Sequence, residues 1–347
     1  IKILQDMNFD VILGNPPYMV MDGGAQASAA PIYNLFVDAS AKVKTPFVTM
    51  IMPARWYAGG RGLDEFRLSM LKDNNIRRLD DFTNPESVFP GTNIRGGICY
   101  FLKDLNYDNT SNLVRVITHE KDGISSDTMR SLQIKGIDTF VRDSEAISIL
   151  AKVREASTQF MEEWISPLRP FGFRGYFVND EAFKPTPENI VAPVACIGKG
   201  HQTGYVAREL IRIHTEWIDR YKVIMPRANN IGTELNDDNL NAFVGGPKTI
   251  CTESYLVIGG DADLSEQQSR NLCTYLKTKF ARFMHKLSKT SQDATSKTFS
   301  FVPIQDFTSN SDIDWTKPIH EIDQALYAKY GLEDYVDYIE NSVKPME

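Results

Sequence analysis

Short apolar runs alternate with polar residues along the first 120 residues, in a pattern typical of strands joined by helices. Apolar runs at residues 9–14, 47–53 and 97–102 predict strands, and the spacing at 66–71 predicts a helix. Strands that alternate with helices favour a parallel sheet. The pattern therefore predicts an α/β domain over residues 1–125, in the form of one half of a parallel sheet.

The pattern changes after this point, so we expect a second domain of another class. Residues 126–150 are predicted to form a linker that turns helical, because Ile147, Leu150 and Val153 have helical spacing. Residues 151–305 are predicted to be α+β, and residues 306–347 to be an acidic, helical carboxyl-terminal segment. The elements expected between 151 and 305 are strands at 189–197, 221–225 and 255–258, a helical or mixed stretch at 205–217 and a helix at 264–286.

Four residues directly after the first apolar run point to a reaction: Asn15, Pro16, Pro17 and Tyr18. The Asn15 side-chain oxygen and the Pro16 carbonyl could accept both N–H bonds of an amine conjugated to a ring, and charge developing on that nitrogen would strengthen both bonds. Two prolines fix the backbone and add no competing donor. Tyr18 offers a flat face for a base. The segment therefore predicts methyl transfer to an exocyclic amine.

The alternative is that Asn-Pro-Pro forms only a turn, since Asn and Pro are common turn residues. The second Asn-Pro of this chain, Asn84-Pro85, lacks an apolar run before it and is interpreted as a plain turn. The strand predicted before Asn15 favours the catalytic interpretation.

Residues 15–18 resemble the catalytic motif of the gamma-class, adenine-specific (N6) DNA methyltransferases of type II and IIG restriction-modification systems. Later segments follow that family's order: 33–37, 47–56, 66–71, 76–79 and 86–102. The resemblance implies the carboxyl-terminal half of a Rossmann-like methyltransferase sheet, followed by a target-recognition domain. It further implies a flipped adenine stacked between Tyr18 and Phe89. For Phe89, a purely structural role as an anchor of its loop stays open.

The resemblance also implies S-adenosylmethionine as methyl donor, with Asn15 and Pro17 bordering its site. The family's Gly-rich donor loop precedes the catalytic motif, whereas only fourteen residues do so here. Gly59-Gly60-Arg61-Gly62 comes too late in the order. We therefore expect a fragment of a longer enzyme that is inactive alone, with any nuclease domain in the absent part.

Composition narrows the class of protein. The 347 residues are 42% hydrophobic, without a run of bilayer length or a signal peptide. Four separated cysteines, without a C-x-x-C pair, indicate neither a zinc site nor a disulfide framework. These features predict a cytoplasmic protein without a metal.

A net charge of −7 has the wrong sign for DNA, but residues 306–347 account for all of it. Residues 199–227 and 277–297 are locally basic, which indicates either DNA contact or solvated helix faces. Polar loops in or beside these runs are predicted to touch double-stranded DNA. The residues proposed for that contact are Lys199, His201, Thr203, Arg227, Asn229, Lys289, Thr290 and Ser291.

Two other functions stay open at this stage. RNA or protein-glutamine methyltransferases use the same tetrapeptide, because their targets also present a conjugated amine. Alternatively, the chain is a DNA-recognition module without catalysis of its own. A glutamine methyltransferase should ignore duplex DNA, whereas a recognition module should bind it with strong salt dependence.

Overall fold

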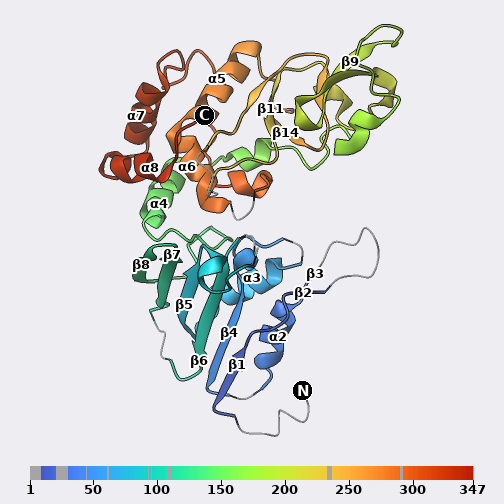
Figure 1. Ribbon diagram of the computed structural model, residues 1–347. Helices are drawn as coiled ribbons and strands as arrows, with labels where there is room; N and C mark the ends of the chain where they lie inside the picture. Colours follow the sequence, from blue (N-terminus) through green and yellow to red (C-terminus); the bar gives the residue numbers. More distant parts are fainter. Residues whose placement is uncertain are drawn as a thin grey trace. The chain divides into compact units, whose positions relative to one another are not determined.

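The chain folds into two compact units, residues 1–147 and 148–347 (Figure 1). The computed structural model describes residues 9–20, 30–43, 45–60, 62–92, 94, 96–107, 111–232, 237–289 and 292–346. None of the helices in these ranges is long and apolar enough to cross a bilayer.

The first unit is built on a six-stranded sheet in the order β1-β4-β6-β5-β7-β8. Its strands are β1 (Val11–Gly14), β4 (Phe47–Pro53), β5 (Ile76–Phe82), β6 (Ile98–Asp104), β7 (Val114–Glu120) and β8 (Gly123–Arg130), with a small hairpin of β2 (Met19–Val20) and β3 (Ala30–Pro31). The α/β prediction is confirmed, and the strands predicted at 47–53 and 97–102 are β4 and β6.

The sheet is mixed, whereas the sequence pattern predicted a parallel one. β1 pairs in parallel with β4, and β5 with β7, but β6 lies antiparallel between β4 and β5. The reason is the connection: the described residues between 83 and 97 hold only the single turn η2 (Pro85–Ser87), and a parallel crossover needs a longer element. β8 is antiparallel because a two-residue turn joins it to β7.

Three helical elements form the core of this unit against one face of the sheet: α2 (Tyr33–Ser40), η1 (Ala54–Tyr57) and α3 (Asp64–Leu71). Val48, Met50 and Met52 alternate along β4 and point into this core, as the strand period requires. Trp56 is fully buried at its centre, where its Nε1 donates to Cys99 Sγ over 3.3 Å.

β1 forms one edge of the sheet, and no described strand pairs with its outer side. Ile12 packs on the core, whereas the side chains of Val11 and Leu13 are 52% and 80% exposed. The strand that leads into Asn15 is therefore apolar on a face that the described residues leave open.

The segment between the two predicted domains differs from the expected linker. Residues 123–130 form β8 of the first sheet, and α4 (Ala146–Ala156) begins in the first unit and continues into the second. β8 is an edge strand, and exposed residues alternate with partly buried ones along its second half, as expected for a strand with one face toward solvent.

The second unit holds two three-stranded sheets and a group of helices, as the α+β prediction requires. One sheet has the order β10-β9-β13 and the other β12-β11-β14. Their bounds are β9 (Pro193–Ile197), β10 (Thr203–Ala207), β11 (Lys222–Pro226), β12 (Phe243–Gly245), β13 (Thr249–Cys251) and β14 (Tyr255–Ile258); the helices are α5 (Glu266–Lys277), α6 (Lys279–Ser288), α7 (Ile319–Lys329) and α8 (Val336–Ser342), and short turns are η3 (Met161–Trp164), η4 (Gly175–Asn179), η5 (Lys199–His201), η6 (Arg208–Leu210), η7 (Thr215–Trp217), η8 (Ser296–Phe299) and η9 (Glu333–Tyr335).

Thr278 divides the helix that was expected over 264–286. Its backbone is extended, and its hydroxyl accepts from Ala281 N at the start of α6. Asp323, on α7, accepts from the amides of Lys279 and Phe280 at 3.0 and 2.9 Å. A cap and a buried carboxylate thus satisfy the free amides of a new helix start. The stretch at 205–217 is mixed, as one of its two predicted alternatives had it, since it begins within β10 and continues as the short turns η6 and η7.

Candidate functional site

A pocket of about 550 Å³ lies at the end of β1 in the first unit. Parallel strands present their carboxyl ends at one edge of a sheet, which is where ligands of open α/β sheets bind. Asn15–Tyr18 follow β1 at this edge, and the segment after β5 reaches it too. Seven residues line the pocket: Asn15, Pro16, Pro17, Tyr18, Phe89, Thr92 and Ile94.

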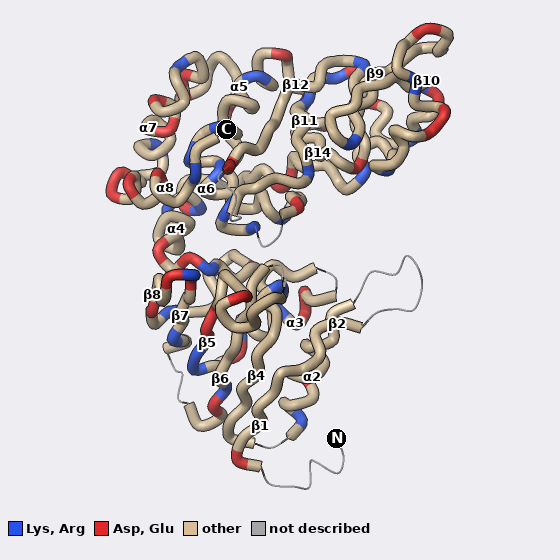
Figure 2. The backbone as a smooth tube through the Cα atoms, in the orientation of Figure 1, with Lys and Arg blue, Asp and Glu red and all other residues tan. Residues whose placement is uncertain are grey.

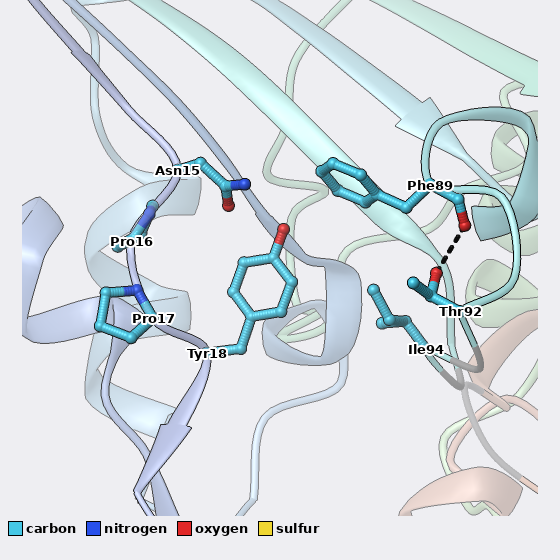
Figure 3. A pocket seen from close by; sticks show the side chains of 7 residues that line it. All are labelled: Asn15, Pro16, Pro17, Tyr18, Phe89, Thr92 and Ile94. Atoms are coloured by element: carbon cyan, nitrogen blue, oxygen red, sulfur yellow. Dashed lines mark hydrogen bonds between the residues drawn. The ribbon is translucent and has the colours of Figure 1, made fainter.

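The pocket brings the predicted catalytic segment and Phe89 together from opposite sides (Figure 3). Asn15 is exposed and Pro16 is buried, so the asparagine amide is available while the backbone beside it is held. The Phe89 ring faces Tyr18 across the gap, and Thr92 Oγ1 donates to the Phe89 carbonyl over 2.7 Å. The two aromatic residues are thus placed to flank a flat ligand.

Tyr18 is fixed through its backbone, because its carbonyl accepts from Ile32 N at 3.2 Å. Its hydroxyl is buried and has no hydrogen-bond partner among the described residues. Burial raises the pKa of Tyr18, and the neighbouring Cys99 adds to that rise. The thiol of Cys99 has its own pKa raised to about 12 by burial. Both groups are therefore neutral near pH 7.

Sequence reasoning missed Thr92 and Ile94 as lining residues. They follow Phe89 in the same turn-rich loop, so the position of Phe89 was the available signal. It also missed Arg142, which lies far along the chain and contacts the end of this loop at Gly96 O.

The loops proposed to touch DNA lie in the second unit, and contacts link three of them. His201 packs edge-on against Tyr255 with ring centroids 5.7 Å apart, and Tyr255 is the register partner of Pro226. Arg227 O in turn accepts from Ala294 N at 2.7 Å. The segment at 226–230 is therefore in contact both with the segment at 199–203, through Tyr255, and with residues 292–294.

The side chains in these loops differ in what they offer a ligand. Lys199, His201 and Thr203 are exposed at the turn between β9 and β10. Arg227 is partly exposed and lies 3.6 Å from Asp293. The first three side chains are exposed and Arg227 is partly exposed beside Asp293, and their role toward DNA stays a prediction.

The side chains of Asn229 and Lys289 make contacts within the second unit, which corrects the expectation that both are free to contact DNA. Asn229 is buried. Lys289 Nζ donates to the carbonyls of Asn229 and Ile231 at 2.8 and 2.9 Å, and burial lowers its pKa to about 8. Its ammonium therefore holds the 229–231 loop. Thr290 and Ser291 lie outside the described residues.

Three of the six basic residues at 277–297 bind the carboxyl-terminal segment instead of forming an open cationic face. Lys279, Arg282 and Lys286, all on α6, donate to the carbonyls of Glu340, Lys344 and Ser342 at 3.0, 2.8 and 2.7 Å. Cations near a helix carboxyl terminus complement its dipole and its free carbonyls. Figure 2 shows Lys and Arg along α6 and Asp and Glu along α7 and α8.

The described residues contain no group of three or more His, Cys, Asp or Glu side chains that could hold a metal ion. They also contain no Gly-rich turn between a strand and a following helix of the kind that binds a nucleotide-like cofactor.

Comparisons with known proteins agree with the motif. Residues 1–89 match the Eco57I restriction-modification methylase family. A curated protein of Mycoplasma pneumoniae, described as an uncharacterized adenine-specific methylase, is 35% identical over 104 residues, which cover 29% of this chain and 25% of the relative. The chain thus matches about a quarter of that relative's length.

Solved structures of restriction-modification enzymes are similar over most of the chain at low identity. The type IIL enzyme MmeI in complex with DNA is 10% identical, with 96% of this chain and 56% of that chain covered and a TM-score of 0.45. The type IIG endonuclease BpuSI is 12% identical, with 90% and 48% covered and a TM-score of 0.32. The family match and the adenine-specific relative confirm, over the amino-terminal part of this chain, its resemblance to the adenine methylases of restriction-modification systems.

Proposed function

We propose that this chain is the catalytic and target-recognition part of a site-specific DNA adenine-N6 methyltransferase of a restriction-modification system. The observation that carries the proposal is the pocket in which Asn15–Tyr18 face Phe89. The family match over residues 1–89 supports it. The second unit would read the DNA sequence through its exposed loops, and the protein would act in the cytoplasm.

The geometry accounts for the chemistry that we propose. A flipped adenine would insert between Tyr18 and Phe89, and stacking on an aromatic side chain contributes about 1–3 kcal/mol per base. Its exocyclic amine would donate to Asn15 Oδ1 and to the Pro16 carbonyl. The amine nitrogen gains positive charge as the new bond forms, so both acceptors bind the transition state more strongly than the ground state.

The donor would be S-adenosylmethionine, which supplies an electrophilic methyl group on sulfur. Asn15 and Pro17 are the residues of this chain that we propose to border it. The described residues lack a Gly-rich donor loop, so the remainder of that site is proposed to come from other sequence of the complete gene product.

The test is transfer of a labelled methyl group from S-adenosylmethionine to mixed-sequence bacterial DNA, with the complete gene product and the 347-residue chain in parallel. We expect N6-methyladenine with the complete product. Asn15→Ala should abolish the label and leave DNA affinity within about twofold. Asn106→Ala is the matched control, because Asn106 is exposed in a turn after β6. This turn lies at the end of the strands opposite to the pocket, since β6 runs antiparallel to β4. Label in RNA or protein, and none in DNA, would refute the proposal.

A further inference from the structure

The loop that carries Phe89 is closed tightly at its base. It leaves the sheet after Phe82 and returns at Gly97, and these ends touch. Gly97 has φ +84°, and a Cβ atom there would lie 2.4 Å from the Phe82 carbonyl oxygen and 2.8 Å from Arg142 Nη2. Only glycine tolerates this combination of backbone angle and close approach. The loop opposite Asn15–Tyr18 therefore begins and ends at two residues in contact, Phe82 and Gly97, and the Arg142 guanidinium packs against this contact.

Arg142 joins three parts of the first unit at this base. Its Nη2 donates to Asp81 Oδ1 at 3.0 Å and also to the Gly96 carbonyl, while its Nε lies 3.0 Å from Asp81 Oδ2. The guanidinium carbon lies 5.1 Å from the centre of the Tyr57 ring. Asp81 is fully buried at the end of β5. One side chain thus connects β5, the returning end of the Phe89 loop and η1.

The arrangement requires arginine in particular. Nη2 makes both hydrogen bonds, while Nε keeps the positive charge beside Asp81 Oδ2 and the plane of the guanidinium lies over the Tyr57 ring. A lysine ammonium is a point charge on a flexible stem, so it lacks both the plane over Tyr57 and the second nitrogen beside Asp81 Oδ2. Retaining the positive charge alone should therefore not retain the position of the loop.

We infer that Arg142 is a positioning residue that sets the place of Phe89 opposite Asn15 and Tyr18, and so sets how well the flipped base is held. This inference rests on the proposed function. Arg142 lies outside the pocket and acts through the loop. A misplacement of about 1 Å in a group that orients a substrate is enough to lower a rate by about a hundredfold.

The first test is kinetic. In the complete gene product, Arg142→Lys should lower the single-turnover methylation rate at saturating DNA by about 10- to 100-fold, with the Kd for DNA changed less than about twofold. Arg115→Lys is the matched control, since Arg115 pairs with both oxygens of Asp127 on the exposed hairpin of β7 and β8. An unchanged rate for Arg142→Lys would overturn the inference.

A double-mutant cycle separates positioning from general damage. If Arg142 acts through Phe89, then Arg142→Lys should lower the rate less than about threefold in a Phe89→Ala background. Losses that multiply in the double variant would show that Arg142 acts elsewhere, and would refute its positioning role.

Hydrogen exchange provides a readout that does not depend on catalysis and uses the 347-residue chain itself. Arg142→Lys should speed amide exchange about tenfold or more in peptides from the Phe89 loop, and Gly97→Ala should do the same in the same peptides. Unchanged exchange in Arg142→Lys would overturn the inference. If wild-type enzyme transferred no methyl group, the proposed function would fail, while this measurement would still decide whether Arg142 holds the loop.

Discussion

Arg282→Met is the sharpest test of whether the basic helix α6 holds the carboxyl-terminal segment or faces DNA. Arg282 is 3% exposed, so methionine can replace most of its buried stem. Its Nη1 donates to Lys344 O at 2.8 Å and, less closely, to Asp238 O at 3.4 Å. The substitution leaves both carbonyls without this donor in a buried place.

The magnitude follows from these contacts. A hydrogen bond to a charged group contributes about 1.5–3 kcal/mol to stability. The bond to Lys344 counts fully, whereas the bond to Asp238 is long and counts for little. The free energy of unfolding should therefore fall by about 1.5–3 kcal/mol. For a unit of this size each kcal/mol corresponds to about 2–4 °C, so Tm should fall by roughly 3–12 °C.

The assay is urea unfolding followed by tryptophan fluorescence, together with DNA binding across salt concentrations. Lys277→Met is the control, because Lys277 is exposed on the neighbouring helix α5, and it should leave stability unchanged. A phosphate contact at Arg282 would contribute about 0.9 to the slope of log K against log salt, and we expect no such change. A reduced slope with unaltered stability would refute our assignment of Arg282 to the carboxyl-terminal segment.

Three further predictions concern single groups. Burial lowers the pKa of His285 to about 3, so below pH 6.5 the unfolded chain binds more protons than the folded chain. The free energy of unfolding should therefore fall by about 2 kcal/mol from this group as the pH is lowered from 7 to 5. His285→Asn should reduce this loss, measured by urea unfolding at the two pH values. All four cysteines are buried, and burial raises the pKa of each thiol, so Ellman's reagent should react quickly only after unfolding in guanidinium. Tyr18→Phe should keep most methylation and Tyr18→Ala should lose about 1–3 kcal/mol of base stacking; equal single-turnover rates for the two variants would argue against stacking.

Local chemistry made the pocket predictable to a large extent. Asn15–Tyr18 combine acceptors, rigid prolines and an aromatic ring within four residues. Such a short motif indicates its chemistry without knowledge of the fold. Phe89 was predicted to lie opposite, and the pocket contains it. Its role toward a base stays a prediction. Arg142 could not be predicted, because its importance comes from Asp81 and Gly96, which are distant in sequence and meet it only in the folded unit.

Charge was the less reliable guide. A run of Lys and Arg specifies neither what the side chains reach nor whether they are buried. Lys286 and Lys289 donate to backbone carbonyls that the sequence does not reveal as acceptors. Strand direction was unpredictable for a related reason, since the place of β6 between β4 and β5 depends on long-range pairing.

Among the described residues the outer edge of β1 is unpaired, which has a consequence for how the 347-residue chain behaves by itself. An unpaired edge strand with exposed apolar side chains is a template for pairing with another chain, and β1 carries no charge over Val11–Gly14 to prevent it. Sedimentation of the isolated chain should therefore depend on concentration, and affinities measured near micromolar levels would report a mixture of oligomers. Leu13→Lys places a charge on the open face, so it should shift that mixture toward monomer without disturbing the core.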